Sequence, residues 1–166
     1  MKEFFKKGSY LLLVLGIFLL VGCGNSSAKE VSFESQYIRT DGNVVEIDSP
    51  SVTKITSVQE LMDYYNNNKD NYNFSDNSVD SISFITAIDK YDEDYFKDSF
   101  LVLVLVREDN GNVFHTVNKV TDKGNISIDR NLLDNDNQDI ASWHIIIELD
   151  KKYSNIDYQV NLGKID

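Results

Sequence analysis

The stretch Phe100–Val106, which reads FLVLVLV, decides the fold expected for this chain of 166 residues. A short run of apolar residues rich in Val and Leu is typical of a strand that is covered on both faces. Asn110 and Gly111 follow it, and this pair is the strongest short signal for a tight hairpin. We therefore expect a central strand over 100–106, with Val113–Thr121 returning beside it as its partner.

Alternating polarity extends the predicted sheet beyond this central strand. Over Trp143–Leu149 the odd-numbered residues are all apolar, which indicates a strand with one buried face. Turn signals separate several weaker candidates. These candidate strands are 31–40 with a hairpin partner at 44–47, 126–130 and 158–162. Strands that follow one another through tight turns favour an antiparallel meander.

Local capping signals indicate where helices begin. Ser57 and Glu60 form a capping box, in which each side chain accepts a hydrogen bond from the backbone N–H of the other residue. Apolar residues follow at helical spacing and predict an amphipathic helix from Ser57 to about Asn68. Residues 84–88 fit either a short helix or a strand, and the acidic residues 92–94 precede a helix of one or two turns. The expected class is α+β, mainly an antiparallel β-meander sheet packed against one or two short helices.

The first 22 residues have the pattern of an export signal. Lys2, Lys6 and Lys7 are followed by the uninterrupted apolar run LLLVLGIFLLV at 11–21. A membrane-spanning helix needs about 20 apolar residues, so this run is too short to cross the bilayer core. A positively charged start followed by a short apolar run is typical of a secretory signal peptide.

The motif Leu20-Val21-Gly22-Cys23 resembles the lipobox of bacterial lipoproteins. The resemblance implies that a signal peptidase recognises Leu20, Val21 and Gly22, that diacylglycerol is attached to the Cys23 thiol, and that the chain is cleaved before Cys23. Two acyl chains hold a protein on a membrane where one chain would not. The alternatives are an ordinary secretory signal whose apolar region ends in a buried Cys, and an uncleaved membrane anchor.

These signals divide the chain into three parts. Residues 1–22 are the expected lipoprotein signal peptide, 23–30 a lipidated flexible tether of small and polar residues, and 31–166 a single extracytoplasmic α+β domain. The expected location is the cell membrane, with the domain anchored by lipid on its extracytoplasmic face. Abundant Asn and scarce Pro suggest an AT-rich genome and hence a Gram-positive bacterium.

Charge and cysteine content exclude several function classes. The net charge is −11, and cleavage after Gly22 would remove three Lys and one Glu, which leaves 13 basic and 26 acidic side chains and a net charge of −13. An acidic chain without a basic tract does not suit nucleic-acid binding, because neutralising phosphates supplies most of that affinity. A single Cys excludes an intrachain disulfide and every multi-cysteine metal site.

The order of elements over residues 82–150 resembles the C-terminal domain of PrcB-type protease-complex subunits, and a broader set of lipoproteins from Gram-positive anaerobes. The resemblance is carried by Tyr95-Phe96, by Phe100–Val104 and by Trp143–Leu149. It implies a small β-rich domain and a non-catalytic accessory role beside a surface protease. The chain departs from the family at Asp109–Phe114, where DNGNVF stands in place of a Thr-Gly-Gly-Tyr hairpin. If that hairpin is the family's contact surface, the function need not carry over.

Catalysis, a metal and a cofactor are not predicted. The chain has no Gly-x-Ser-x-Gly elbow, and Cys23 is assigned to the lipid. His115 and His144, on predicted strands, would need to meet each other and Glu148 to bind a metal, so ordinary sheet residues are the preferred interpretation. The carboxylates of Asp92, Glu93 and Asp94 could serve acid–base chemistry, but such residues before a helix usually act as caps.

Two further binding hypotheses stay open. Asp134–Asp139 has Asp at alternate positions, as calcium loops do, but it lacks a Gly at the sixth position and has Ile145 where the Glu would stand. Trp143 and the tyrosines could line a glycan groove, although a lone Trp on an alternating strand usually belongs to the core.

The sequence thus predicts a lipid-anchored surface lipoprotein with a binding or accessory role towards an envelope protein. The alternatives are a small cell-wall hydrolase that uses surface carboxylates, and a module that binds calcium or a small ligand.

Overall fold

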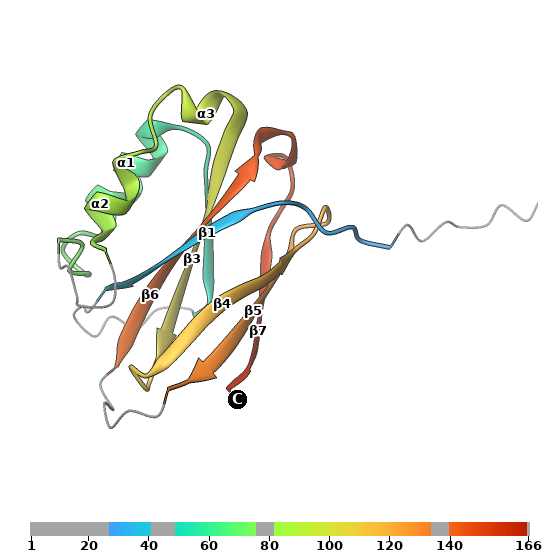
Figure 1. The fold of residues 1–166 in the computed structure, drawn as a ribbon. Coiled ribbons are helices and arrows are strands. Elements are labelled where there is room, and N and C mark those ends of the chain that lie inside the picture. Colours follow the sequence, from blue (N-terminus) through green and yellow to red (C-terminus); the bar gives the residue numbers. More distant parts are fainter. Residues whose placement is uncertain (1–26, 41–48, 76–81, 134–139, 166) are drawn as a thin grey trace, which may run out of the picture.

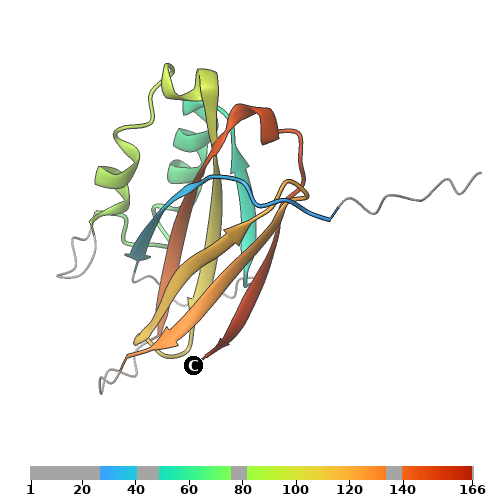
Figure 2. The ribbon, with the colours of Figure 1, turned by 45° about the vertical axis from the view of Figure 1, so that its right-hand side comes forward.

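A computed structural model describes residues 27–40, 49–75, 82–133 and 140–165. Within these residues, seven strands and three short α-helices form an α+β fold, as predicted. Figures 1 and 2 show three layers, with helices on one face of a central sheet and a second sheet on the other face.

The central sheet has the strand order β1-β6-β3-β2, and all of its neighbouring strands are antiparallel. Its longest strands, β3 (Ser99–Glu108) and β6 (Ala141–Asp150), are paired along their whole length in the middle of the sheet. The edges are β1 (Glu34–Thr40) and β2 (Ser51–Ile55).

The second sheet has the order β4-β5-β7. Strands β4 (Val113–Val120) and β5 (Asn125–Leu132) are antiparallel, whereas β7 (Gln159–Ile165) lies parallel to β5. A single turn of 3-10 helix, η1 (Lys151–Tyr153), follows β6 and begins the crossing from the central sheet to β7.

Helix α1 (Val58–Asn68) begins where the capping box predicts. The Ser57 hydroxyl accepts a hydrogen bond from the Glu60 N–H at 3.2 Å. The Glu60 carboxylate accepts from the N–H of Thr56 at 2.6 Å, one residue earlier than the capping box predicts. The helices α2 (Phe84–Ile88) and α3 (Tyr95–Asp98) follow, so residues 84–88 form a helix and not a strand.

Strand β3 separates two hydrophobic cores. Its even-numbered residues from Phe100 to Val106 face the three-stranded sheet, and its odd-numbered residues from Leu101 to Leu105 face the helices. All seven residues are buried, which confirms that the apolar run is covered on both faces. Burying this much apolar surface is the main stabilising contribution that the sequence offers.

The predicted pairing of 100–106 with 113–121 is wrong. Strand β3 is paired with β2 and β6, and β4 belongs to the other sheet. The turn at Asp109–Asn112 therefore crosses from one sheet to the other instead of closing a hairpin. The physical reason is that β3 needs apolar cover on its second face, and β4 supplies part of it through Val117 and Val120.

The interpretation of Trp143–Leu149 as a half-buried strand is also wrong, because His144 and Ile146 are fully buried under the helices. The last strand exists, but its pairing with β5 is parallel and not part of a meander. Strand β2 was not predicted, although the β-branched residues of SVTKI offered a signal for it. The proposed strand at 44–47 lies outside the described residues.

The amino-terminal segment is bonded to the end of β4. The N–H of Val31 donates to the Val120 carbonyl at 2.9 Å, and the Asp122 N–H donates to the Lys29 carbonyl at 2.8 Å. A β-bridge joins Glu30 to Thr121. The last two residues of the predicted tether, Lys29 and Glu30, are therefore held against the sheet.

Gly124, in the turn between β4 and β5, should tolerate no side chain. Its φ is +78°, and an added Cβ would lie 2.0 Å from the carbonyl oxygen of Asp157. We expect Gly124→Ala to lower the free energy of unfolding by roughly 2 kcal/mol or more, from the left-handed backbone and the clash together. Gly163→Ala is the control, because its added Cβ would come only within 3.3 Å of the Ile128 oxygen. Equal losses for both variants in urea unfolding would contradict this explanation.

Candidate functional site: a groove between α1 and α2

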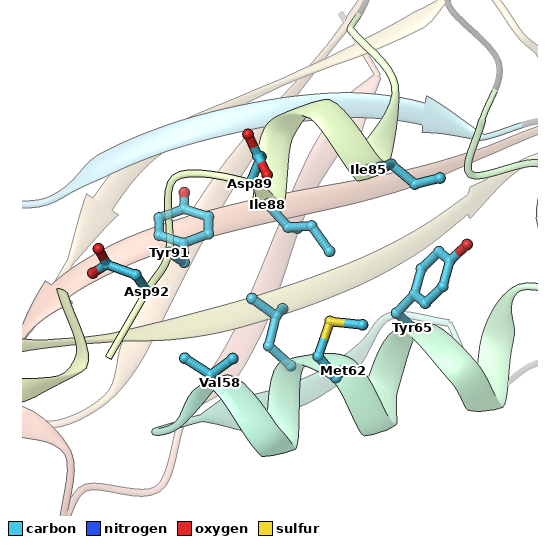
Figure 3. Close-up of a pocket in the computed structure, with 9 residues that line it drawn as sticks. Val58, Met62, Tyr65, Ile85, Ile88, Asp89, Tyr91 and Asp92 are labelled. Carbon is cyan, nitrogen blue, oxygen red and sulfur yellow. The ribbon is translucent and has the colours of Figure 1, made fainter. Parts of the chain in front are cut away.

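A groove of about 430 Å³ lies between α1 and the segment that contains α2. Figure 3 shows side chains of the two segments facing each other across it. The groove exists because α1 is apolar along one side for two turns, whereas α2 has only five residues and covers part of that side. It is lined by Val58, Leu61, Met62, Tyr65, Ile85, Ile88, Asp89, Tyr91 and Asp92.

The apolar lining is only partly shielded from water. Of the lining residues, Leu61, Ile88 and Tyr91 are buried. Met62 and Ile85 remain 41% and 42% exposed on opposite sides, one on each helix. Large apolar side chains that gather around a groove are typical of a binding surface, since leaving them in water is unfavourable.

One end of the groove is acidic. Figure 3 shows Asp89 and Asp92 at the same end as Tyr91, away from Tyr65 and Ile85. The Asp92 Oδ1 accepts a hydrogen bond at 2.8 Å from the N–H of Tyr95, the first residue of α3. No cationic side chain is among the described residues that line the groove.

The polar network behind Tyr91 fixes this end of the groove. The Tyr91 hydroxyl donates to Glu148 Oε1 at 2.8 Å and accepts from the Gln36 amide at 2.6 Å. Lys90 Nζ lies 2.7 Å from the same Glu148 oxygen, so its charge is already paired. Burial raises the pKa of Tyr91, and the hydrogen bond to the Glu148 carboxylate raises it further, so the phenol stays neutral and keeps donating.

The two histidines lie on opposite sides of the central sheet and cannot share a ligand. His115 lies against Trp143 between the two sheets, with ring centroids 5.5 Å apart, whereas His144 lies beneath the helices. Glu148 is engaged by Lys90 and Tyr91. Within the described residues, no three side chains of the types that bind metals gather in one place.

His144 is fully buried among aromatic rings. Its Nδ1 lies 2.8 Å from the Thr40 hydroxyl, and Nε2 has no hydrogen-bond partner among the described residues. Burial lowers the pKa of His144 to about 3, because removing the ring from water disfavours its charged form. Four rings meet the imidazole edge-on at centroid distances of 4.8 to 5.9 Å, those of Tyr64, Tyr72, Phe74 and Phe84.

His115 belongs to a buried ion network between the sheets. Its Nε2 lies 2.9 Å from Glu108 Oε1, and the Arg130 guanidinium binds both oxygens of the same carboxylate. Burial alone would raise the pKa of Glu108, but the hydrogen bonds from His115 and Arg130 and the Arg130 charge outweigh it and lower the pKa. Glu108 therefore remains ionised, and the network ties the end of β3 to β4 and β5.

The remaining predicted residues fall in separate places. Of the three acidic residues at 92–94, only Asp92 lines the groove, and Asp94 forms an exposed ion pair with Lys97. Trp143 is buried in the core between the sheets and not in a glycan groove.

The turn at Asp109–Phe114 is not a projecting loop. Gly111 and Asn112 are buried, and Arg39 donates to the Gly111 carbonyl at 3.1 Å. Because His144 is buried as well, the turn and His144 do not line a common binding site on the surface.

Several predictions fall outside the described residues. These concern Leu20, Val21, Gly22 and Cys23, the signal peptide and the loop Asp134–Asp139. Among the residues that the structure describes, no helix combines the length and the apolar character needed to cross a membrane.

No family model, curated protein or solved structure matches this chain. The resemblances to lipobox proteins and to the PrcB C-terminal domain stay predictions from the sequence. The groove itself was not predicted, although the helical spacing of Val58, Leu61, Met62 and Tyr65 did identify the face of α1 that lines it.

We expect stability to fall as the pH drops below about 6.5, the usual pKa of an unfolded His. Between that pH and about 3, His144 is protonated in the unfolded state but stays neutral in the folded state. The free energy of unfolding should therefore decrease by about 1.4 kcal/mol for each unit by which the pH falls. Urea unfolding measured above the carboxylate range isolates this effect.

His144→Phe is the matched variant for this measurement. It keeps an aromatic ring and leaves the Thr40 hydroxyl its bond to the Ser142 carbonyl, but it cannot titrate. The variant should show a shallower pH dependence than the original chain. Identical slopes for the two proteins would contradict the assignment to His144.

Proposed function

We propose that this chain is a lipid-anchored cell-surface lipoprotein whose folded domain binds another envelope protein and catalyses no reaction. The lipobox motif ending at Cys23 supports the anchor. The observation that carries the binding role is the partly exposed apolar groove between α1 and α2.

The chemistry of the groove favours binding over catalysis. Among the described residues, its lining contains no His, Ser, Cys or Lys. It therefore lacks the usual combination of a nucleophilic side chain and a neighbouring general base. Its two carboxylates are accompanied by apolar and tyrosine side chains, and Asp92 accepts a hydrogen bond from the first residue of α3. Apolar lining with a few polar groups is the usual composition of a recognition site.

The position of the groove suits an anchored binding protein. In Figures 1 and 2 the described chain begins on the side of the molecule away from α1 and α2. A tether that leads from this side to the membrane leaves the groove accessible to a neighbouring protein. The resemblance to PrcB-type subunits suggests a surface protease as that neighbour.

Replacing the thiol should release the protein from the membrane. In Cys23→Ala the lipid has no sulfur to attach to, and a leader too short to span the bilayer should not hold the chain firmly. We expect the original protein in the membrane fraction, and the variant to lose that firm attachment when membranes are washed with salt and carbonate. Mass spectrometry of the original chain should find diacylglycerol on an amino-terminal Cys23. Equal retention of both proteins, or an intact unmodified leader, would contradict the anchor.

The rival hydrolase makes a different prediction for Asp92 and Asp94. If the domain only binds, the full chain should release no soluble fragments from purified cell wall, and Asp92→Asn with Asp94→Asn should cost only a modest loss of helix stability. Release of dye-labelled wall fragments that disappears in this double variant would establish the rival. Glu93→Gln serves as the control for the loss of a neighbouring carboxylate, since the rival places the chemistry on Asp92 and Asp94.

A further inference from the structure

We infer that the groove between α1 and α2 takes a peptide segment of a partner protein that carries large apolar side chains and a Lys or Arg at one end. This inference rests on the proposed binding role and specifies the chemistry of the bound segment.

The apolar part of the groove sets the first requirement. A volume of about 430 Å³ is suited to a few side chains rather than to a whole domain. Met62 and Ile85 stand on opposite sides, so a segment lying between them would remove both from water. An amphipathic segment that inserts its apolar side chains into a groove is a common mode of peptide recognition.

The charge at the other end sets the second requirement. Asp89 has no hydrogen bond or ion pair through its side chain with any residue that the structure describes, and Asp92 uses one oxygen for the Tyr95 N–H. The nearest lysine along the chain, Lys90, is directed to Glu148. A partner's Lys or Arg at this end would pair with the carboxylate of Asp89 or of Asp92, which lie on either side of Tyr91. Charge-assisted hydrogen bonds of this kind are stronger than those between neutral groups.

A protein segment fits these features better than a lipid surface does. Bacterial membranes and cell walls are anionic, and the carboxylates of Asp89 and Asp92 together with the overall negative charge of the chain would repel them. The described chain also begins on the opposite side from the groove, so a membrane-bound tether does not direct the groove at the bilayer.

The test uses the full chain in detergent micelles and a phage-displayed library of short random peptides, with counter-selection against Met62→Ser. We expect the enriched peptides to combine large apolar residues with a Lys or Arg. A fluorescent synthetic peptide of the enriched sequence then reports affinity by anisotropy. Met62→Ser should weaken binding about fivefold or more, because it removes buried apolar area.

The charge requirement is tested with the double variant Asp89→Asn, Asp92→Asn. The amide oxygen that replaces the Asp92 carboxylate can still accept from the Tyr95 N–H, so the start of α3 is preserved. We expect weaker binding and a flatter dependence on salt than in the original protein. Two controls should change neither quantity, namely Glu93→Gln for charge and Ile165→Ser for a similarly exposed apolar residue on β7.

Three results would overturn the inference. The first is no enrichment beyond that on Met62→Ser, the second is enriched peptides without a cationic residue, and the third is binding that the double variant leaves unchanged. Vesicles of phosphatidylglycerol should not bind through the groove, and vesicle binding that Met62→Ser abolishes would assign the groove to the membrane. The result is independent of anchoring, because Cys23→Ala should bind the same peptide equally well.

Discussion

Strand β3 is apolar on both faces from Phe100 to Val106, and this single constraint organises the molecule. A strand of this kind is stable only when both of its faces are removed from water, so the central sheet needs cover on both sides. One face is covered by the sheet β4-β5-β7, and the other by the helices. The crossing of the chain at Asp109–Asn112 and the burial of His144 agree with this need for two covers.

The two covers differ in quality. The three-stranded sheet covers its side with buried apolar residues of β4 and β5, whereas the helical cover consists of α1 and two much shorter helices. Aromatic rings fill part of the space between them, and those of Tyr72, Phe74 and Phe84 gather around His144. The cover is still incomplete between α1 and α2, and the groove lies there. The candidate site thus arises where short helices incompletely cover the apolar residues of β3.

The sequence predicts the features that depend on nearby residues. The double burial of Phe100–Val106 can be inferred from that stretch alone, and the start of α1 from Ser57 and Glu60. Strand pairing is different, because Asn110-Gly111 favours a local hairpin while the choice between sheets depends on cover from distant segments. The groove could not be predicted for the same reason. It depends on how α1 and α2 lie relative to each other, and no local pattern encodes that placement.

The bonds between Lys29–Val31 and the end of β4 have a mechanical consequence. Tension that reaches the domain from its amino-terminal side is taken first by this short ladder and by the Thr121–Gly124 turn, rather than by α1 or α2. After rupture of these bonds, β1 would be the next element to bear the load. If the chain is anchored as we propose, tension on the anchor would therefore act first on a part of the domain that lies away from the proposed binding groove.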